Sequence, residues 1–119
     1  MDPLAIPAAQ PPRLTPDAIA AAAGFLADGR PRILYEAHQF GRLTGGRWNG
    51  THPDISRRTW TRGLYLGGAA EYGRLERAML LDREAALQSA SWGLFQIMGF
   101  NHTLAGFASV EAMVADAMT

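Results

Sequence analysis

The 119-residue sequence contains neither cysteine nor lysine. The absence of cysteine excludes a disulfide framework and a thiolate zinc site, so packing alone must hold the fold together. Because lysine is absent, all eleven basic residues are arginines, and eleven acidic residues balance them. A net charge of zero creates no overall field that would draw the protein to nucleic acid or to an anionic membrane. We therefore expect neither partner.

Long hydrophobic runs are also absent. The longest apolar stretch, Ala18–Ala27, is too short to cross a bilayer, which takes about 20 residues. The N-terminus carries Asp2 and several prolines where a signal peptide would carry basic residues. We expect no membrane span and no signal peptide, and hence synthesis in the cytoplasm.

The three histidines, His38, His52 and His102, lack the short spacings that metal sites use, so we expect no metal and no other cofactor. Arginines surround Trp60, and such a basic and aromatic pattern can contact nucleic acid or another anionic polymer. Because no net charge supports that contact, an exposed loop is the simpler interpretation.

Length and composition indicate one globular domain, since 48% of the residues are hydrophobic and 18% are charged. Residues 1–13 include four prolines, which prevent regular hydrogen bonding. We interpret this segment as a leader or linker, so the domain spans residues 14–119.

Helix-start residues and apolar periodicity predict helices along most of the domain. Thr15, Pro16 and Asp17 form one start signal, and Asp82 and Ser109 are N-cap candidates for two later helices. The predicted helices lie at about 16–26, 36–43, 71–80, 83–90, 93–98 and 110–117.

Two segments depart from this helical pattern. Arg32–Glu36 is rich in β-branched and aromatic residues and predicts a short strand or an extended entry to a helix. Thr44–Gly68 shows no sustained period and predicts a long irregular segment, with a small hairpin as an option; such loops usually carry function. The sequence thus predicts a mainly α fold of the α+β type, with a small β element and a long irregular loop.

The stretch Ala85–His102 has the composition of a sugar-binding surface. It combines small residues with Trp92, a single Gln96 among apolar neighbours, and Asn101. A sugar site needs an aromatic wall for the ring face and amide or hydroxyl groups for the hydroxyl and N-acetyl groups. The alternative is that the aromatic side chains form core and that Gln96 is a buried amide with satisfied hydrogen bonds.

Four collinear segments resemble the phage-endolysin N-acetylmuramidase family, a branch of the lysozyme-like group. They are Pro31–Phe40 (PRILYEAHQF), His52–Ser56 (HPDIS), Glu71–Leu75 (EYGRL) and Ser91–Met98 (SWGLFQIM). The last string is also similar to the motif that lines the glycan cleft of goose-type lysozymes and lytic transglycosylases. Together the resemblance covers most of residues 24–118.

This resemblance implies a lysozyme-like fold and hydrolysis of the β-1,4 bond between N-acetylmuramic acid and N-acetylglucosamine. The implied partner is the glycan strand of peptidoglycan, met in the cell wall or periplasm after release or injection from the cytoplasm. On the same grounds, the substrate-binding candidates are His38, Ser91, Trp92, Gln96 and Asn101.

The sequence departs from the family pattern at the expected general acid. Family members carry a glutamate in a segment before the turn at Asp28–Pro31, whereas here Ala20–Ala23 runs directly into Gly24. The pattern indicates an internal deletion and a truncated domain. Apolar surface exposed by the deletion would favour homo-oligomers. The alternative function is a catalytically impaired peptidoglycan-binding or structural remnant.

Glu36 is the remaining candidate for the catalytic carboxyl. A glycosidase needs a carboxyl held protonated near the leaving oxygen, and Glu36 follows a short apolar run in a matched segment. The alternative is a structural carboxylate that pairs with His38 or Arg42 across one helical turn. We expect Gln96 and Ser91 to face an open groove near Glu36, because a helix from Gly93 must bury its apolar residues on other faces.

The other acidic residues are poorer candidates. Glu71 and Glu76 lie on a charge-rich helix with Arg74 and Arg77, which is typical of a solvated face. Asp54 follows a proline in the irregular segment, where it is expected to form a turn or to hold a water or a sugar hydroxyl.

Overall fold

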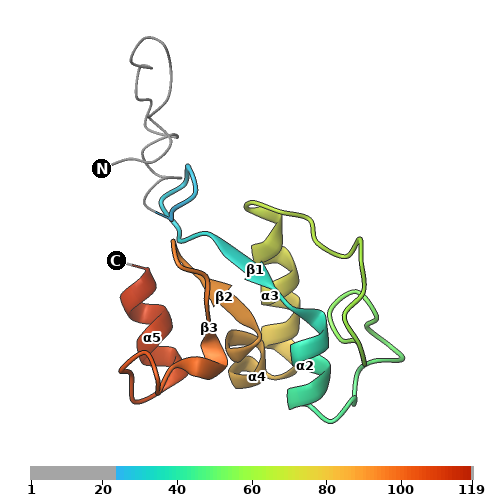
Figure 1. Cartoon of the computed structure of the whole chain (residues 1–119). Helices are drawn as coiled ribbons and strands as arrows, with labels where there is room; N and C mark the ends of the chain where they lie inside the picture. The colour runs from blue at the N-terminus through green and yellow to red at the C-terminus, as the bar shows by residue number, and fades with distance from the viewer. Residues whose placement is uncertain (1–23, 119) are drawn as a thin grey trace.

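The computed structural model describes residues 24–118, and helices dominate it (Figure 1). The helices are α2 (Ala37–Leu43), α3 (Ala70–Leu81), α4 (Arg83–Gln88) and α5 (Val110–Ala117), and η2 (Gly99–Asn101) is a 3₁₀ turn. The strands are β1 (Ile33–Tyr35), β2 (Ala90–Trp92) and β3 (Ile97–Met98). The predicted α+β class is confirmed. The predicted leader lies outside the described residues.

The three strands form one antiparallel sheet in the order β1, β2, β3. Leu34 of β1 faces Ser91 of β2, which in turn faces Met98 of β3. Ile33 and Tyr35 point to the buried face, as the alternation of side chains along a strand requires. The predicted strand around Ile33–Tyr35 is therefore confirmed, and it lies at one edge of the sheet.

The predicted helix at 93–98 is wrong, because this segment forms the turn and second strand of a β-hairpin. Gly93 and Gln96 have positive φ angles of 74° and 49°, which an α-helix does not contain. A short run that is apolar apart from Gln96 fits a buried strand as well as a helix, and periodicity alone cannot separate the two. The outcome is decided by pairing of β3 with β2, which in turn pairs with β1, far away in the sequence.

The helices predicted at 36–43, 71–80, 83–90 and 110–117 are confirmed. The Asp82 carboxylate accepts a hydrogen bond from the Ala85 amide, and the Ser109 hydroxyl accepts one from the Ala112 amide, so both act as N-caps. Helix α4 ends earlier than predicted, at Gln88, because the chain turns there into β2.

The helix predicted at 16–26 lies mostly outside the described residues. Its last part, residues 24–26, is not helical. Phe25 instead forms an isolated antiparallel bridge with Pro31, and Gly24 has a φ angle of 84°. A turn therefore stands where the end of the helix was predicted.

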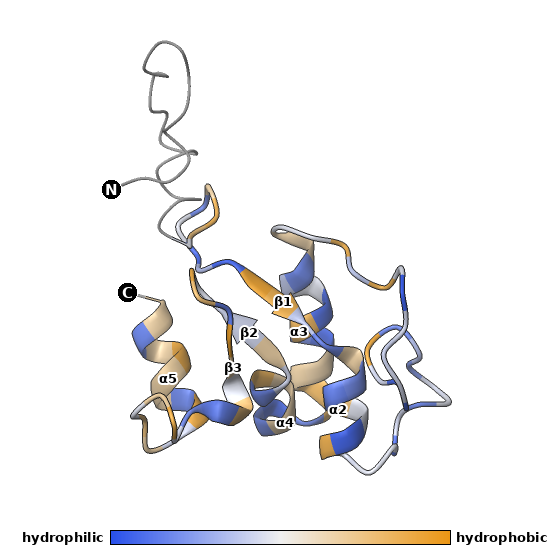
Figure 2. Cartoon of the chain, in the orientation of Figure 1, coloured by the Kyte–Doolittle hydropathy of each residue, from blue (hydrophilic) through white to orange (hydrophobic). Residues whose placement is uncertain are grey.

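The hydrophobic core forms where the sheet meets α3 and α4. The large apolar contributors are Ile33, Tyr35, Phe40, Ile55, Tyr72, Leu75, Leu87, Trp92, Val110 and Met113. Helices α2 and α3 alternate hydrophilic and hydrophobic residues, as helices that bury one face do (Figure 2). No helix in the described part of the chain is long and apolar enough to cross a membrane.

Residues 44–68 form the predicted irregular segment, which makes a long excursion between α2 and α3 (Figure 1). Ile55 fixes it to the core, since its side chain is fully buried and its carbonyl accepts a 2.7 Å hydrogen bond from the Tyr35 hydroxyl. The segment thereby lies beside the junction of β1 and α2.

Candidate active site

Glu36 occupies the junction between β1 and α2. Its amide donates to the Ser89 carbonyl (2.8 Å), and its own carbonyl accepts from the amides of Gln39 and Phe40, which starts α2. The Glu36 side chain makes no capping hydrogen bond, and 16% of its surface is exposed. The backbone is thus fixed on both sides while the carboxyl group extends toward the irregular segment.

Tyr65 holds one oxygen of the Glu36 carboxyl. The Tyr65 hydroxyl donates to Glu36 Oε1 in a very short hydrogen bond and accepts a 2.8 Å bond from Trp60 Nε1. Because the indole N–H can only donate, the Tyr65 proton must point to Glu36. Burial and then the bond to Glu36 raise the pKa of Tyr65 to about 12, so Tyr65 remains a donor at neutral pH.

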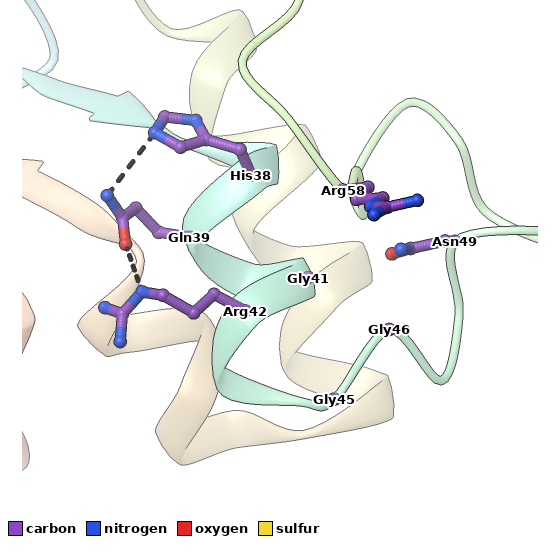
Figure 3. A pocket seen from close by; sticks show the side chains of 8 residues that line it. All are labelled: His38, Gln39, Gly41, Arg42, Gly45, Gly46, Asn49 and Arg58. Atoms are coloured by element: carbon purple, nitrogen blue, oxygen red, sulfur yellow. Dashed lines mark hydrogen bonds between the residues drawn. The ribbon is translucent and has the colours of Figure 1, made fainter.

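His38 faces the same carboxyl oxygen, with its Nδ1 3.7 Å from Glu36 Oε1. Arg42 Nε donates to Gln39 Oε1 (2.9 Å), and Gln39 Nε2 lies 3.3 Å from His38 Nε2 (Figure 3). Arginine can only donate, so the Gln39 amide nitrogen faces His38, and His38 Nε2 must accept. Neutral His38 then carries its proton on Nδ1, toward Glu36.

These contacts form one continuous line of polar side chains, which we call the polar row: Trp60, Tyr65, Glu36, His38, Gln39 and Arg42. Glu36 is its only carboxyl. Tyr65 contacts Oε1, and within residues 24–118 no hydrogen bond or ion pair engages Oε2. Oε2 is therefore the atom at which Glu36 can gain or release a proton.

Glu71 cannot play this role, although it belongs to a matched segment. Its side chain is fully buried; Oε1 accepts from the Tyr35 amide (2.8 Å) and from Arg74, and Oε2 accepts from the amides of Leu66 and Gly67. The expectation of a solvated residue is wrong. Glu71 is a structural carboxylate that joins α3 to β1 and to the irregular segment.

Asp54 is likewise engaged. Partial burial raises the pKa of Asp54, but the hydrogen bond and the charge of Arg77 outweigh burial, so that the pKa lies below its usual value. The Asp54 carbonyl also accepts two hydrogen bonds from Arg74, the shorter of 2.7 Å. Glu36 thus remains the carboxyl of this region that is available for chemistry.

Ser91 and Trp92 are both buried. Both belong to β2, the middle strand, and their exposed fractions are 5% and 4%. Trp92 packs edge-on against Tyr72, and its Nε1 donates to the Leu87 carbonyl (3.3 Å). The expectation that Trp92 forms the aromatic wall of a sugar site is therefore wrong. Trp92 is a core residue, as the alternative interpretation held.

Gln96 bonds to the residue before β1, whereas Glu36 follows that strand. Its amide nitrogen donates to the carbonyls of Arg32 (3.1 Å) and Gly93 (2.7 Å), and its oxygen accepts from Ser91 (2.8 Å). Arg32 precedes β1 and Glu36 follows it, so the two lie at opposite ends of the strand. Gln96 thus closes the hairpin, and the groove expected for Glu36, Ser91 and Gln96 stays a prediction.

Of the six candidate residues, Glu36 and His38 come together in the polar row, and Ser91 and Gln96 come together in the hairpin. Asn101 ends the η2 turn and is partly exposed; its neighbour Phe100 lies under the guanidinium of Arg42, 5.4 Å from ring centroid to Cζ. Tyr65 was missed by sequence analysis, since the irregular segment has no period that would single it out.

Comparisons with known proteins agree with the motifs. A family model described as N-acetylmuramidase matches residues 18–119. The crystal structure of the Burkholderia AP3 phage endolysin is similar at 40% sequence identity and a TM-score of 0.76, over 84% of this chain. The chain spans 39% of the length of that endolysin. No curated protein matches. The expected lysozyme-like fold is thereby confirmed.

Proposed function

The chain belongs to the N-acetylmuramidase family, and on that premise we propose that it cleaves the β-1,4 bond between N-acetylmuramic acid and N-acetylglucosamine. Its partner is the glycan strand of peptidoglycan. It acts on the cell wall once lysis, a holin or an injection device has released it from the cytoplasm. The observation that carries the proposal is the polar row. In it, the Tyr65 hydroxyl donates a hydrogen bond to Glu36 Oε1, while Glu36 Oε2 has no partner among the described residues.

In the proposed reaction, Glu36 Oε2 donates its proton to the glycosidic oxygen as the bond from that oxygen to the anomeric carbon breaks. The carboxylate that results then takes a proton from the water that adds to the anomeric carbon. Tyr65 holds Oε1 during both steps, which leaves Oε2 to exchange the proton. Glu36 is restored to its protonated form at the end of the cycle.

A second candidate is a peptidoglycan-binding protein of low activity. Glycosidases commonly use two carboxyl groups, one on each side of the bond. The polar row supplies one, while Asp54 is paired with Arg77 and Glu71 is buried in hydrogen bonds. With no second carboxyl to act as nucleophile or base, an arrangement with Glu36 alone favours slow turnover.

The experiment is a turbidity assay on purified peptidoglycan, with release of reducing ends as a second readout. We expect wild-type protein to release reducing ends slowly and Glu36→Gln to lose at least about 100-fold of that rate. Glu76→Gln, on the exposed face of α3, is the matched control. Sedimentation with insoluble peptidoglycan measures binding separately. Binding without any release of reducing ends would favour the second candidate, and activity that survives Glu36→Gln would exclude Glu36 as the acid.

A further inference from the structure

A hollow of about 490 Å³ lies beside α2, next to the polar row. It is lined by His38, Gln39, Gly41, Arg42, Gly45, Gly46, Asn49 and Arg58. In Figure 3 the side chains from α2 extend to one side of the helix, Asn49 and Arg58 lie on the other, and Gly41 stands between them. Its volume is that of a small-molecule site.

Close backbone packing fixes the far rim of the hollow. A Cβ atom on Gly41 would lie 2.1 Å from the Arg57 carbonyl oxygen, so only glycine lets the irregular segment approach α2 here. The Arg57 amide also donates to the Ala37 carbonyl (3.0 Å). These two contacts hold the backbone of Arg58, the next residue, at the edge of the hollow.

The hollow is positively charged. Arg42 and Arg58 are both exposed, and no aspartate or glutamate is among the lining residues. Within residues 24–118 neither arginine has a carboxylate partner, whereas Arg30 pairs with Asp28 and Arg83 with Glu111. A guanidinium recognises a carboxylate through paired hydrogen bonds. Because Arg42 Nε is already bonded to Gln39, Arg58 is the arginine that can form such a pair, and Arg42 adds its positive charge. The hollow therefore suits a carboxylate ligand.

The hollow adjoins the proposed reaction centre through His38, which lines it and whose Nδ1 lies 3.7 Å from Glu36 Oε1. A glycan strand bound over Glu36 would bring a muramic acid residue to this place. Each muramic acid carries a short peptide on its lactyl group, and the carboxylates of that peptide are the anionic groups closest to the bond.

We propose that this hollow binds a carboxylate of the peptide attached to muramic acid, so that the protein distinguishes peptide-bearing from peptide-free glycan. The choice of ligand rests on the proposed function. The site itself rests on three observations: the two arginines that line the hollow, the close backbone packing at Gly41, and His38, which lines the hollow and also lies beside Glu36.

Isothermal titration calorimetry tests the site without requiring cleavage. The probes are N-acetylmuramoyl-L-alanyl-D-glutamate and the same compound with both carboxylates amidated. We expect the full chain to bind the acid at least about tenfold more tightly than the diamide, and Arg58→Gln to lose that preference. Arg83→Gln, an exposed arginine outside the hollow, should retain it. Equal affinity for the two probes, or no measurable binding of either, would overturn the proposal.

Cleavage assays keep this failure distinct from failure of the proposed function. Cleavage of peptide-free glycan strands depends on the glycosidase site alone. Cleavage of peptide-bearing strands depends on that site and on binding of the peptide in the hollow. We expect Arg58→Gln to raise KM about tenfold for peptide-bearing strands and to leave peptide-free strands unchanged. Cleavage of both substrates with the same KM in wild type and Arg58→Gln would refute the peptide site while supporting the glycosidase. If neither substrate is cleaved, the glycosidase fails and the calorimetry alone decides the inference.

Discussion

The Tyr65 hydroxyl is the donor that orients the Glu36 carboxyl, because Trp60 occupies its acceptor side. We expect Tyr65→Phe to lower kcat about tenfold, since Oε1 loses its partner and Glu36 samples more rotamers. KM should change less than about twofold, because the ring keeps its packing. The measurement is the initial rate of reducing-end release over a range of peptidoglycan concentrations.

Trp60→Phe provides the graded control for this effect. It removes the bond to Tyr65 and leaves the contact between Tyr65 and Glu36, so the loss in kcat should be smaller. Equal rates for wild type and Tyr65→Phe would mean that Glu36 is oriented by other groups.

At the level of helices and strands, the buried pair of Glu71 and Arg74 joins α3 to β1 and to the irregular segment. Arg74 donates to the carbonyls of Tyr35 (3.2 Å) and Asp54 (2.7 Å), and it is 2% exposed. We expect Arg74→Met to lower the free energy of unfolding by about 3–5 kcal/mol, because Glu71 would remain buried without its countercharge. Urea denaturation measures this change.

Arg77 offers the comparison on the same helix. Its pair with Asp54 is half-exposed, so Arg77→Met should cost less than about 1 kcal/mol. Similar losses for Arg74→Met and Arg77→Met would show that the buried pair contributes no more than a surface one.

The helices could be predicted from sequence because their signals are local. Asp82 and Ser109 cap helices within three residues of themselves, and the sequence shows this directly. The hairpin from β2 to β3 could not be predicted from sequence. Strand β2 forms by pairing with β1, where Leu34, 57 residues before Ser91, is its partner. Propensity in the short apolar run gives no information on that distant partner.

The residues of the site also fall into those that could be predicted from the sequence and those that could not. Glu36 could be identified because it follows a strand and opens a helix within one matched segment. Its partners Tyr65 and Trp60 lie in the irregular segment, and the tertiary fold alone brings them to it, since Tyr65 is 29 residues from Glu36. Gln96 was predicted to lie on a helix, and a helix and a hairpin direct the same side chain to different neighbours.

For the whole molecule, tyrosine ionisation should set the alkaline limit of stability. Burial raises the pKa of Tyr35 and brings that of Tyr72 to about 12, and that of Tyr65 is also about 12, against about 10 in the unfolded chain. Folding therefore favours the protonated form. The stability that this supplies is complete below about pH 10 and is lost as the pH rises toward 12.

No lysine or cysteine side chain titrates near this pH range, because the sequence contains neither residue. We expect the free energy of unfolding to fall above pH 10 by up to about 1.4 kcal/mol per pH unit for each buried tyrosine. Tyr72→Phe should be less stable at neutral pH, because Tyr72 donates to the Pro31 carbonyl (2.6 Å), but should decline less steeply. Urea denaturation across this range measures both slopes. Parallel slopes would contradict the assignment.

The tip of the hairpin is the surface through which we expect self-association. Leu94, Phe95 and Ile97 are 44%, 82% and 39% exposed and lie close together in the sequence. Analytical ultracentrifugation should show reversible dimers that Phe95→Ser weakens, because it removes the largest exposed apolar side chain of the tip. Leu104→Ser, equally exposed but in the turn before α5, is the control. A wild-type protein that stays monomeric at high concentration would contradict this expectation.

The position of Trp60 gives the protein a built-in optical reporter. Its indole is 52% exposed and bonded to Tyr65 at one end of the polar row, whereas Trp92 is 4% exposed in the core. Fluorescence from Trp60 will therefore be quenched by small solutes in water, while that from Trp92 is shielded. A saccharide that covers Glu36 will displace water from Trp60 and shift its emission. Occupancy of the site can thus be followed without a label and without any bond being cleaved.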